Sequence, residues 1–156
     1  AFVTAELFKQ GMLLIALQLI PSFAATTATR ARQLLFRSVT IGMLLMIVLG
    51  GAVVLLLPKV LPMVFTSKYV ESVLYAQLLL SGTVLGYPGN LINHYFAARG
   101  RTAAQYRIAL TIFLLELMML FALVGSLGVL GAVIAKAVAR AAYTPVGLWL
   151  LAREVE

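Results

Sequence analysis

The chain has no cysteine, no aspartate and few charged residues of either sign. Without cysteine it can form no disulfide framework, thiol nucleophile or thiolate metal site. Charged residues make up 11% of its 156 residues and hydrophobic residues 63%, whereas about 25% of an ordinary soluble chain is charged. So few polar side chains cannot cover the apolar surface of a soluble domain. The composition therefore predicts a protein whose solvent is the lipid bilayer.

Long apolar runs organise the whole sequence. A helix that crosses the hydrocarbon core of a membrane needs about 20 mainly apolar residues. Five runs of suitable length lie near residues 8–27, 38–57, 72–97, 106–124 and 129–151. The joins between them are short and contain no soluble domain. We therefore predict an all-α fold, a single polytopic transmembrane helix bundle with about five spans over residues 1–156.

The basic residues are distributed as in a membrane protein. Twelve lysines and arginines against five glutamates give a formal charge of +7. They lie in short clusters between the apolar runs and not on one soluble face, which argues against a nucleic-acid partner. The first join carries Arg30, Arg32 and Arg37, and the third carries Arg99 and Arg101. The positive-inside rule predicts that both joins and the C-terminus are cytoplasmic.

Charged residues inside the last two runs are the strongest candidates for function. Lys136, Arg140 and Tyr143 fall at i, i+4 and i+7 of one helix face, with Thr144 beside them. Arginine at the centre of a spanning helix costs about 2.5–3.5 kcal/mol on insertion scales, so this face must meet protein or water. Glu116 is the only acid within a predicted span, and the short glycine-marked turn between the two runs brings it level with Lys136. We expect a Glu116–Lys136 or a Glu116–Arg140 ion pair.

Two cations against one acid leave a surplus of positive charge among these residues. We hypothesise that Arg140, together with Lys136, attracts an anionic group such as a lipid phosphate, because guanidinium presents a planar fork to phosphate oxygens. Under this hypothesis Arg140→Gln abolishes transport and leaves membrane insertion intact. An ion pair that only holds two helices together explains the same residues equally well, and both interpretations stay open.

The third run contains small residues and a proline. Gly82 and Gly86 form a face that lets another helix approach closely, and Pro88 predicts a bend. Tyr87 and Asn90 begin a polar face toward the predicted cytoplasmic end. We expect this face to line a transport path.

Other polar residues indicate no catalytic chemistry. Gln18 belongs to a polar stripe on the first run. Either hydrogen bonding between spans or contact with a substrate explains this stripe. No Ser-His-Asp set, carboxylate pair or phosphate-binding loop is present, so we expect a protein that is not an enzyme. The one histidine, His94, has no second histidine or cysteine at metal-ligand spacing. Neither a metal nor another cofactor is expected.

Three short motifs point to a known family. Residues 64–72 read VFTSKYVES, residues 96–101 read FAARGR, and residues 125–135 read GSLGVLGAVIA. Together they resemble the C-terminal half of bacterial polysaccharide flippases, which belong to the multidrug/oligosaccharidyl-lipid/polysaccharide exporter superfamily. The resemblance spans nearly the whole chain.

This resemblance implies a function, a location and partners. It implies a multi-pass transporter of the bacterial cytoplasmic membrane that moves a polyprenyl-diphosphate-linked oligosaccharide to the outer leaflet during cell-surface polysaccharide synthesis. Family members have about twelve or more helices in two bundles that alternate access. The chain would then be a fragment that supplies the later helices, and its partner would be the N-terminal bundle of the same transporter.

Specific residues are expected to serve this transporter. Glu116 is the expected ion-pairing or coupling residue. The expected substrate-binding residues are Gln18, Asn90, Lys136, Arg140 and Tyr143. Two other functions stay open. A cation-coupled multidrug or metabolite antiporter would use Glu116 for sodium or protons, although the surplus of cations favours the anionic lipid. A membrane scaffold without a transported substrate would need only the intact set of five helices.

Overall fold

A computed structural model describes Glu6, residues 10–11, residues 18–64 and residues 70–153 of the chain. Residues 18–25 are helical, and three long helices follow. They are α2 (Ala28–Val64), α3 (Val70–Ala98) and α4 (Thr102–Arg153). No strand occurs in these described ranges, so the predicted all-α fold class is confirmed.

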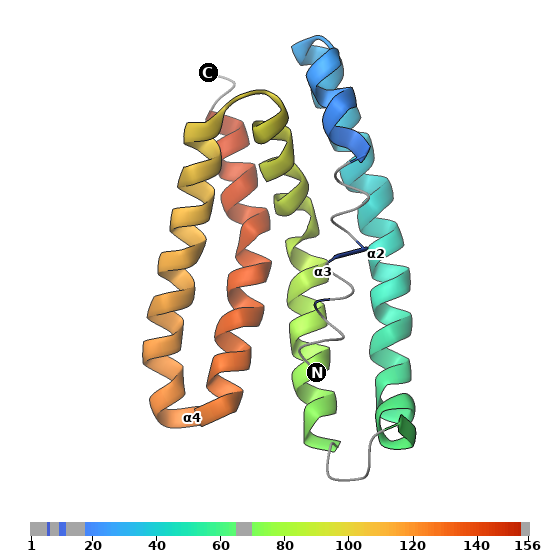
Figure 1. Cartoon of the computed structure of the whole chain (residues 1–156), viewed down its shortest axis with the longest axis vertical. Helices are drawn as coiled ribbons and strands as arrows, with labels where there is room; N and C mark the ends of the chain where they lie inside the picture. Colours follow the sequence, from blue (N-terminus) through green and yellow to red (C-terminus); the bar gives the residue numbers. More distant parts are fainter. Residues whose placement is uncertain (1–5, 7–9, 12–17, 65–69, 154–156) are drawn as a thin grey trace.

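Helix α4 is a hairpin of two antiparallel arms, as Figure 1 shows. Its backbone leaves the helical region at Gly128, with φ 56° and ψ −130°. A positive φ is accessible to glycine at little cost, because glycine has no Cβ. The predicted turn at residues 125–128 is therefore confirmed at its last residue. The predicted spans 106–124 and 129–151 lie within the first arm (residues 102–127) and the second arm (residues 129–153).

Helix α2 begins ten residues earlier than the predicted span 38–57, at Ala28. The join between the first two runs is therefore mostly helical, and Arg30 and Arg32 lie on the first turns of α2. Arginine is a good helix former, so a helix can extend beyond the apolar run that would lie in the hydrocarbon.

Helix α2 also continues past Pro58, where the prediction placed its end, and reaches Val64. Proline has no N–H, so Pro58 cannot donate to the Val54 carbonyl one turn earlier. Nε2 of Gln77 on α3 donates to this carbonyl instead, at 3.0 Å. A polar side chain from the neighbouring helix thus satisfies the backbone at the proline, which the sequence of α2 alone does not indicate.

Two of the described helices are long and apolar enough to cross a membrane. Their most apolar windows, in Ala28–Val60 of α2 and in α4, have mean hydropathies of 2.7 and 2.5 and are only 17% and 11% buried. Leu44, Val48 and Phe121 are among the large apolar side chains that face outward. Such surfaces suit lipid better than water. The count of about five spans stays a prediction, since much of the first run, 8–27, lies outside the described residues.

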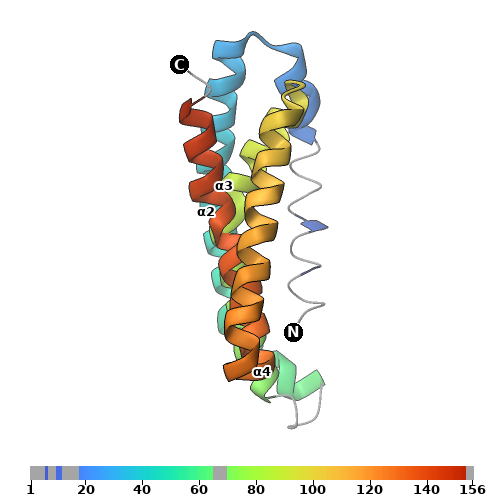
Figure 2. The same cartoon turned by 90° about the vertical axis from the view of Figure 1, so that its left-hand side faces the viewer.

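The connections alternate between the two ends of the bundle (Figures 1 and 2). One end holds the connections at residues 26–27 and 99–101 and the last turn of α4. The opposite end holds the Gly128 turn, the end of α2 and the start of α3. The two arginine-bearing joins therefore lie at the same end, as expected, and we call it the arginine end. Its cytoplasmic orientation stays a prediction from the positive-inside rule.

Helix α3 lies between α2 and the α4 hairpin and contacts both. It matches the predicted run 72–97 within two residues at each end. Large apolar side chains from all the described helices form the core around it. Those that are almost fully buried are Phe23, Leu35, Leu80, Leu91, Ile92, Phe96 and Ile108. Helix α3 therefore supplies the central wall against which a polar site can be built.

Candidate functional site

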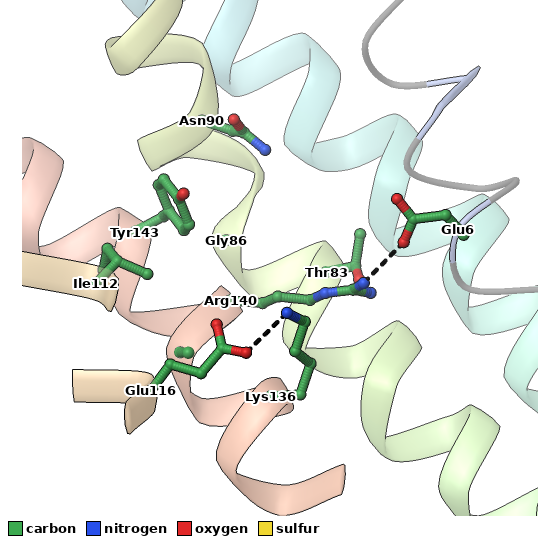
Figure 3. Close-up of a pocket in the computed structure, with 10 residues that line it drawn as sticks. Glu6, Thr83, Gly86, Asn90, Ile112, Glu116, Lys136, Arg140 and Tyr143 are labelled. Carbon is green, nitrogen blue, oxygen red and sulfur yellow. Dashed lines mark hydrogen bonds and ion pairs between the residues drawn. The ribbon is translucent and has the colours of Figure 1, made fainter. Parts of the chain in front are cut away.

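A polar cavity of about 260 Å³ lies between α3 and the two arms of α4 (Figure 3). Helix α3 contributes one hydroxyl and one amide, and the hairpin contributes most of the charge. The polar and charged residues that line the cavity are Glu6, Thr83, Asn90, Glu116, Lys136, Arg140 and Tyr143. The cavity therefore collects five of the six residues that the sequence analysis proposed, namely Asn90, Glu116, Lys136, Arg140 and Tyr143.

Glu116 and Lys136 form an ion pair across the hairpin. Nζ of Lys136 lies 2.7 Å from Oε1 of Glu116, and Figure 3 shows the two side chains pointing toward each other. The side chains are 39% and 25% exposed, respectively. The prediction of an ion pair at Glu116 is confirmed, and its partner is Lys136, because the turn at Gly128 places the two residues at the same level of adjacent arms.

Arg140 is the most enclosed charged group of the cavity, with 11% of its side chain exposed. Its Nη1 donates to Oγ1 of Thr83 on α3 at 2.8 Å. Its Nη2 donates to Oε2 of Glu6 at 3.0 Å. Arg140 thus connects the second arm of α4 both to α3 and to the N-terminal part of the chain. A buried guanidinium needs such partners, because an unpaired charge in an apolar environment is strongly destabilising.

The ion pair with Glu6 corrects the expected surplus of positive charge. Among the residues that the structure describes, two acids and two cations line the cavity, so their formal charges balance. Glu6 was not among the predicted site residues, because it precedes the first predicted span, 8–27, and no spacing relates it to Arg140. The only available signal was the need of Arg140 itself for an acidic partner.

Glycines hold α3 against the second arm of α4. Gly82, Gly86 and Gly89 lie at i, i+4 and i+7, and a methyl group at any of them would lie closer than 3.0 Å to backbone atoms of that arm. These backbone atoms belong to Ala137, Arg140, Tyr143 and Thr144. The close approach predicted for Gly82 and Gly86 is therefore confirmed. It sets the distance over which Arg140 reaches α3.

A threonine from α4 enters the hydrogen-bond ladder of α3 next to Pro88. In a regular helix the N–H of Gly89 donates to the carbonyl of Leu85. Here the Thr144 hydroxyl accepts from the Gly89 N–H at 3.3 Å and donates to the Leu85 carbonyl. A side chain inserted into the ladder is one of the recognised causes of a helix bend. The bend expected at Pro88 stays a prediction, and the inserted Thr144 hydroxyl would contribute to it together with the proline.

Two residues predicted near the site lie elsewhere. Gln18 is exposed on the helical segment 18–25 and does not line the cavity. Tyr87 is buried against α2, where its hydroxyl occupies the space beside Gly42. Both assignments rested on helical periodicity, which identifies residues that share a face but not the neighbour that the face meets. Tyr87 therefore serves the α2–α3 contact and does not line the predicted path.

No group of three or more acidic or histidine residues that could hold a metal ion occurs in the described part of the chain. Comparison of the chain with models of known protein families, with curated proteins and with solved structures found no match. Fold and site together define an all-helical protein with a charged cavity between its helices, two of which are long and apolar enough to cross a membrane.

Proposed function

We propose that the chain is part of a membrane transporter that moves a polyprenyl-diphosphate-linked oligosaccharide across the bacterial cytoplasmic membrane. The observation that carries this proposal is the cavity in which Arg140 lies between α3 and α4 with little exposure. Ionisable groups placed among membrane helices are expensive and are functional candidates by default. The motif resemblance to polysaccharide flippases supports the choice of substrate, and the five-span topology is part of the same proposal.

Exchange of anions at Arg140 provides a means of binding the diphosphate. Both terminal nitrogens of the guanidinium are already engaged, one by Thr83 and one by the Glu6 carboxylate. A phosphate group can accept the same N–H donors as the carboxylate. Substrate binding would then replace Glu6 at Arg140 and would not require a surplus cation. Loss of this ion pair would also detach the N-terminal part of the chain from α4.

The Glu116–Lys136 pair has a different place in this proposal. It joins the two arms of the hairpin and keeps both charges partnered when the substrate is absent. Its greater exposure to the cavity makes it accessible to a second phosphate oxygen or to a coupling ion. The glycine contacts fix α3 to the second arm, so these two helices would move as one unit during alternating access.

Arg140→Gln tests the proposal through binding. The full chain in detergent is titrated with a short-chain polyprenyl diphosphate, and loss of a charged donor should weaken binding about ten- to a hundredfold. Arg107→Gln is the matched control, because Arg107 is an exposed arginine on the same helix and does not line the cavity. In proteoliposomes containing the complete transporter, Arg140→Gln should stop lipid transfer while membrane insertion is unchanged. Equal binding by Arg140→Gln and the control would refute the assignment.

A cation-coupled antiporter is the second candidate, and the balanced charge of the cavity favours it. Glu6 and Glu116 are two acids that could exchange a proton or sodium ion against their paired cations. In this case Glu116→Gln should abolish uptake of an organic cation driven by an ion gradient. Under the flippase proposal the same variant retains diphosphate binding, so the two measurements separate the candidates.

A further inference from the structure

Two uncharged polar side chains line the cavity on the side of Arg140 that faces the arginine end. They are Asn90 of α3 and Tyr143 of the second arm of α4, and both residues are half-buried. Figure 3 shows Arg140 between these two side chains and the Glu116–Lys136 pair. The cavity therefore has a charged part and an uncharged polar part, and a diphosphate at Arg140 would occupy only the charged part.

Close packing of the two helices fixes the positions of Asn90 and Tyr143. Gly89 precedes Asn90 on α3, and a methyl group at Gly89 would collide with the backbone carbonyl group of Tyr143. The N–H of Gly89 also donates to the Thr144 hydroxyl at 3.3 Å. The Tyr143 side chain packs against the buried core. The two residues therefore lie at the same level of adjacent helices, in a site that is formed before a ligand binds.

The hydrogen-bonding groups of both side chains are available to a ligand. Within the described part of the chain, neither the Asn90 amide nor the Tyr143 hydroxyl forms a hydrogen bond to another residue of the cavity. The amide offers two N–H donors and a carbonyl acceptor, and the phenol offers one donor and an acceptor oxygen. Polar groups in enclosed sites are normally paired, so these groups need a ligand or water to complete them.

The chemistry of this pair favours a neutral partner that carries hydroxyl groups. A hydroxyl both donates and accepts, as the amide and the phenol do, whereas neither side chain has a charge that could offset the desolvation of an ion. The ring of Tyr143 and the buried side chain of Ile112 also give the cavity an apolar wall. A sugar ring combines hydroxyl groups at its edge with apolar C–H faces, and so matches both features.

The spacing along α3 suits a sugar linked to a diphosphate. Thr83 marks the position of the guanidinium, because its Oγ1 accepts from Nη1 of Arg140 at 2.8 Å. Asn90 follows seven residues later on the same helix, a rise of about 10 Å. An extended diphosphate that carries one sugar ring spans a similar length. The cavity volume of about 260 Å³ is below the range of about 300–1,000 Å³ for sites that enclose a drug-sized ligand, so only the first sugar of an oligosaccharide would enter.

We propose that Asn90 and Tyr143 bind the sugar ring that is linked directly to the diphosphate, while Arg140 binds the diphosphate itself. This inference rests on the proposed function and assigns a part of the substrate to each side of the cavity. The amide and the phenol exchange hydrogen bonds with ring hydroxyls, and the Tyr143 ring covers one C–H face. A site that hydrogen-bonds a substrate hydroxyl rejects the analogue that lacks it, so the cavity would distinguish a sugar-bearing lipid carrier from an empty one.

A ratio of affinities tests this sugar site. The full chain in detergent is titrated with farnesyl diphosphate and with farnesyl diphosphate that carries one glucose or one N-acetylglucosamine. The parent chain should bind at least one sugar-bearing probe about tenfold more tightly than the bare diphosphate. Asn90→Leu and Tyr143→Phe should each reduce this ratio to about threefold or less. Asn93→Leu and Tyr106→Phe remove the same groups from positions that do not line the cavity, and should keep the ratio of the parent.

A ratio that only the two cavity variants lose supports the sugar site. Equal affinity of the parent for bare and sugar-bearing probes would overturn it and would leave the binding of diphosphate at Arg140 intact. Equal binding of every probe by Arg140→Gln and the parent would instead refute the proposed function. Displacement of the sugar-bearing probe by an equal concentration of phosphatidylglycerol would assign the polar pair to a glycerol headgroup and overturn the sugar. Tyr143→Phe keeps the ring that packs on the core, so this variant decides the outcome even if Asn90→Leu fails to fold.

Discussion

Gly86→Ala should loosen the contact between α3 and the second arm of α4. A methyl group at this position would lie closer than 3.0 Å to the carbonyl carbon and oxygen of Arg140. These are backbone atoms of a helix, so they cannot rotate away as a flexible side chain could. The two helices would have to separate, and Arg140 would move relative to its Thr83 partner.

The expected magnitude follows from two opposing effects. Overpacking of a tight interface costs about 1–3 kcal/mol, and collision with backbone places this case at the upper end. Alanine is better than glycine in a helix by about 1 kcal/mol, which offsets part of the cost. The net destabilisation of Gly86→Ala should therefore be about 2 kcal/mol.

Gly51→Ala provides a control of opposite sign. Gly51 lies within α2, and a methyl group there would meet nothing within 4 Å. Only the helix-propensity gain applies, so this variant should be more stable than the parent by about 1 kcal/mol. The assay is unfolding of the detergent-solubilised full chain by sodium dodecyl sulfate, followed by circular dichroism. If Gly86→Ala proved as stable as Gly51→Ala, the close helix contact would be wrong.

Three further predictions follow from other contacts. Thr144→Val should destabilise α3 near its proline by about 1–3 kcal/mol, because the Gly89 N–H and the Leu85 carbonyl lose their hydrogen-bond partner. Hydrogen exchange of the adjacent amides should become faster, and Thr144→Ser should restore their protection. Glu116→Gln should cost more stability than Glu116→Gln combined with Lys136→Met, because the single change leaves a cation unpaired. In a denaturant titration, an equal loss in both variants would show that an unpaired Lys136 carries no penalty and would contradict this reasoning. The absence of native cysteine permits topology mapping, in which Thr29→Cys should react with an impermeant maleimide only from the cytoplasmic side and Ser126→Cys only from the outside. Labelling of both from the same side would contradict the alternating arrangement of helix ends.

Local patterns predicted the parts of the fold that depend on local physics. The run 72–97 corresponds to α3 because a long apolar stretch without charge forms a helix wherever water is excluded. The hairpin turn at Gly128 was predictable because its glycines punctuate two adjacent runs. The Glu116–Lys136 ion pair could also be predicted, because counting residues from one short turn sets the register of both arms.

Contacts between distant segments were not predictable in this way. Glu6 and Arg140 are separated by 134 residues in sequence, and no periodicity relates them. Gln77 compensates for Pro58 from another helix, so α2 extended beyond the end that its own residues indicated. Helical periodicity also grouped Tyr87 with Asn90, although Tyr87 packs on α2 and Asn90 lines the cavity.

The sequence by itself determined that the chain is helical, that it contains helices long and apolar enough to cross a membrane, and that its basic joins belong at one end. These properties follow from composition and short-range spacing, because a bilayer stabilises any apolar helix that is long enough to cross it. Only the tertiary structure decided which polar groups meet. It gave Arg140 an acidic partner, Glu6, and it placed the Thr144 hydroxyl in the hydrogen-bond ladder of α3. The approach and rotation of packed helices decide such contacts, and they depend on small residues spread over several segments.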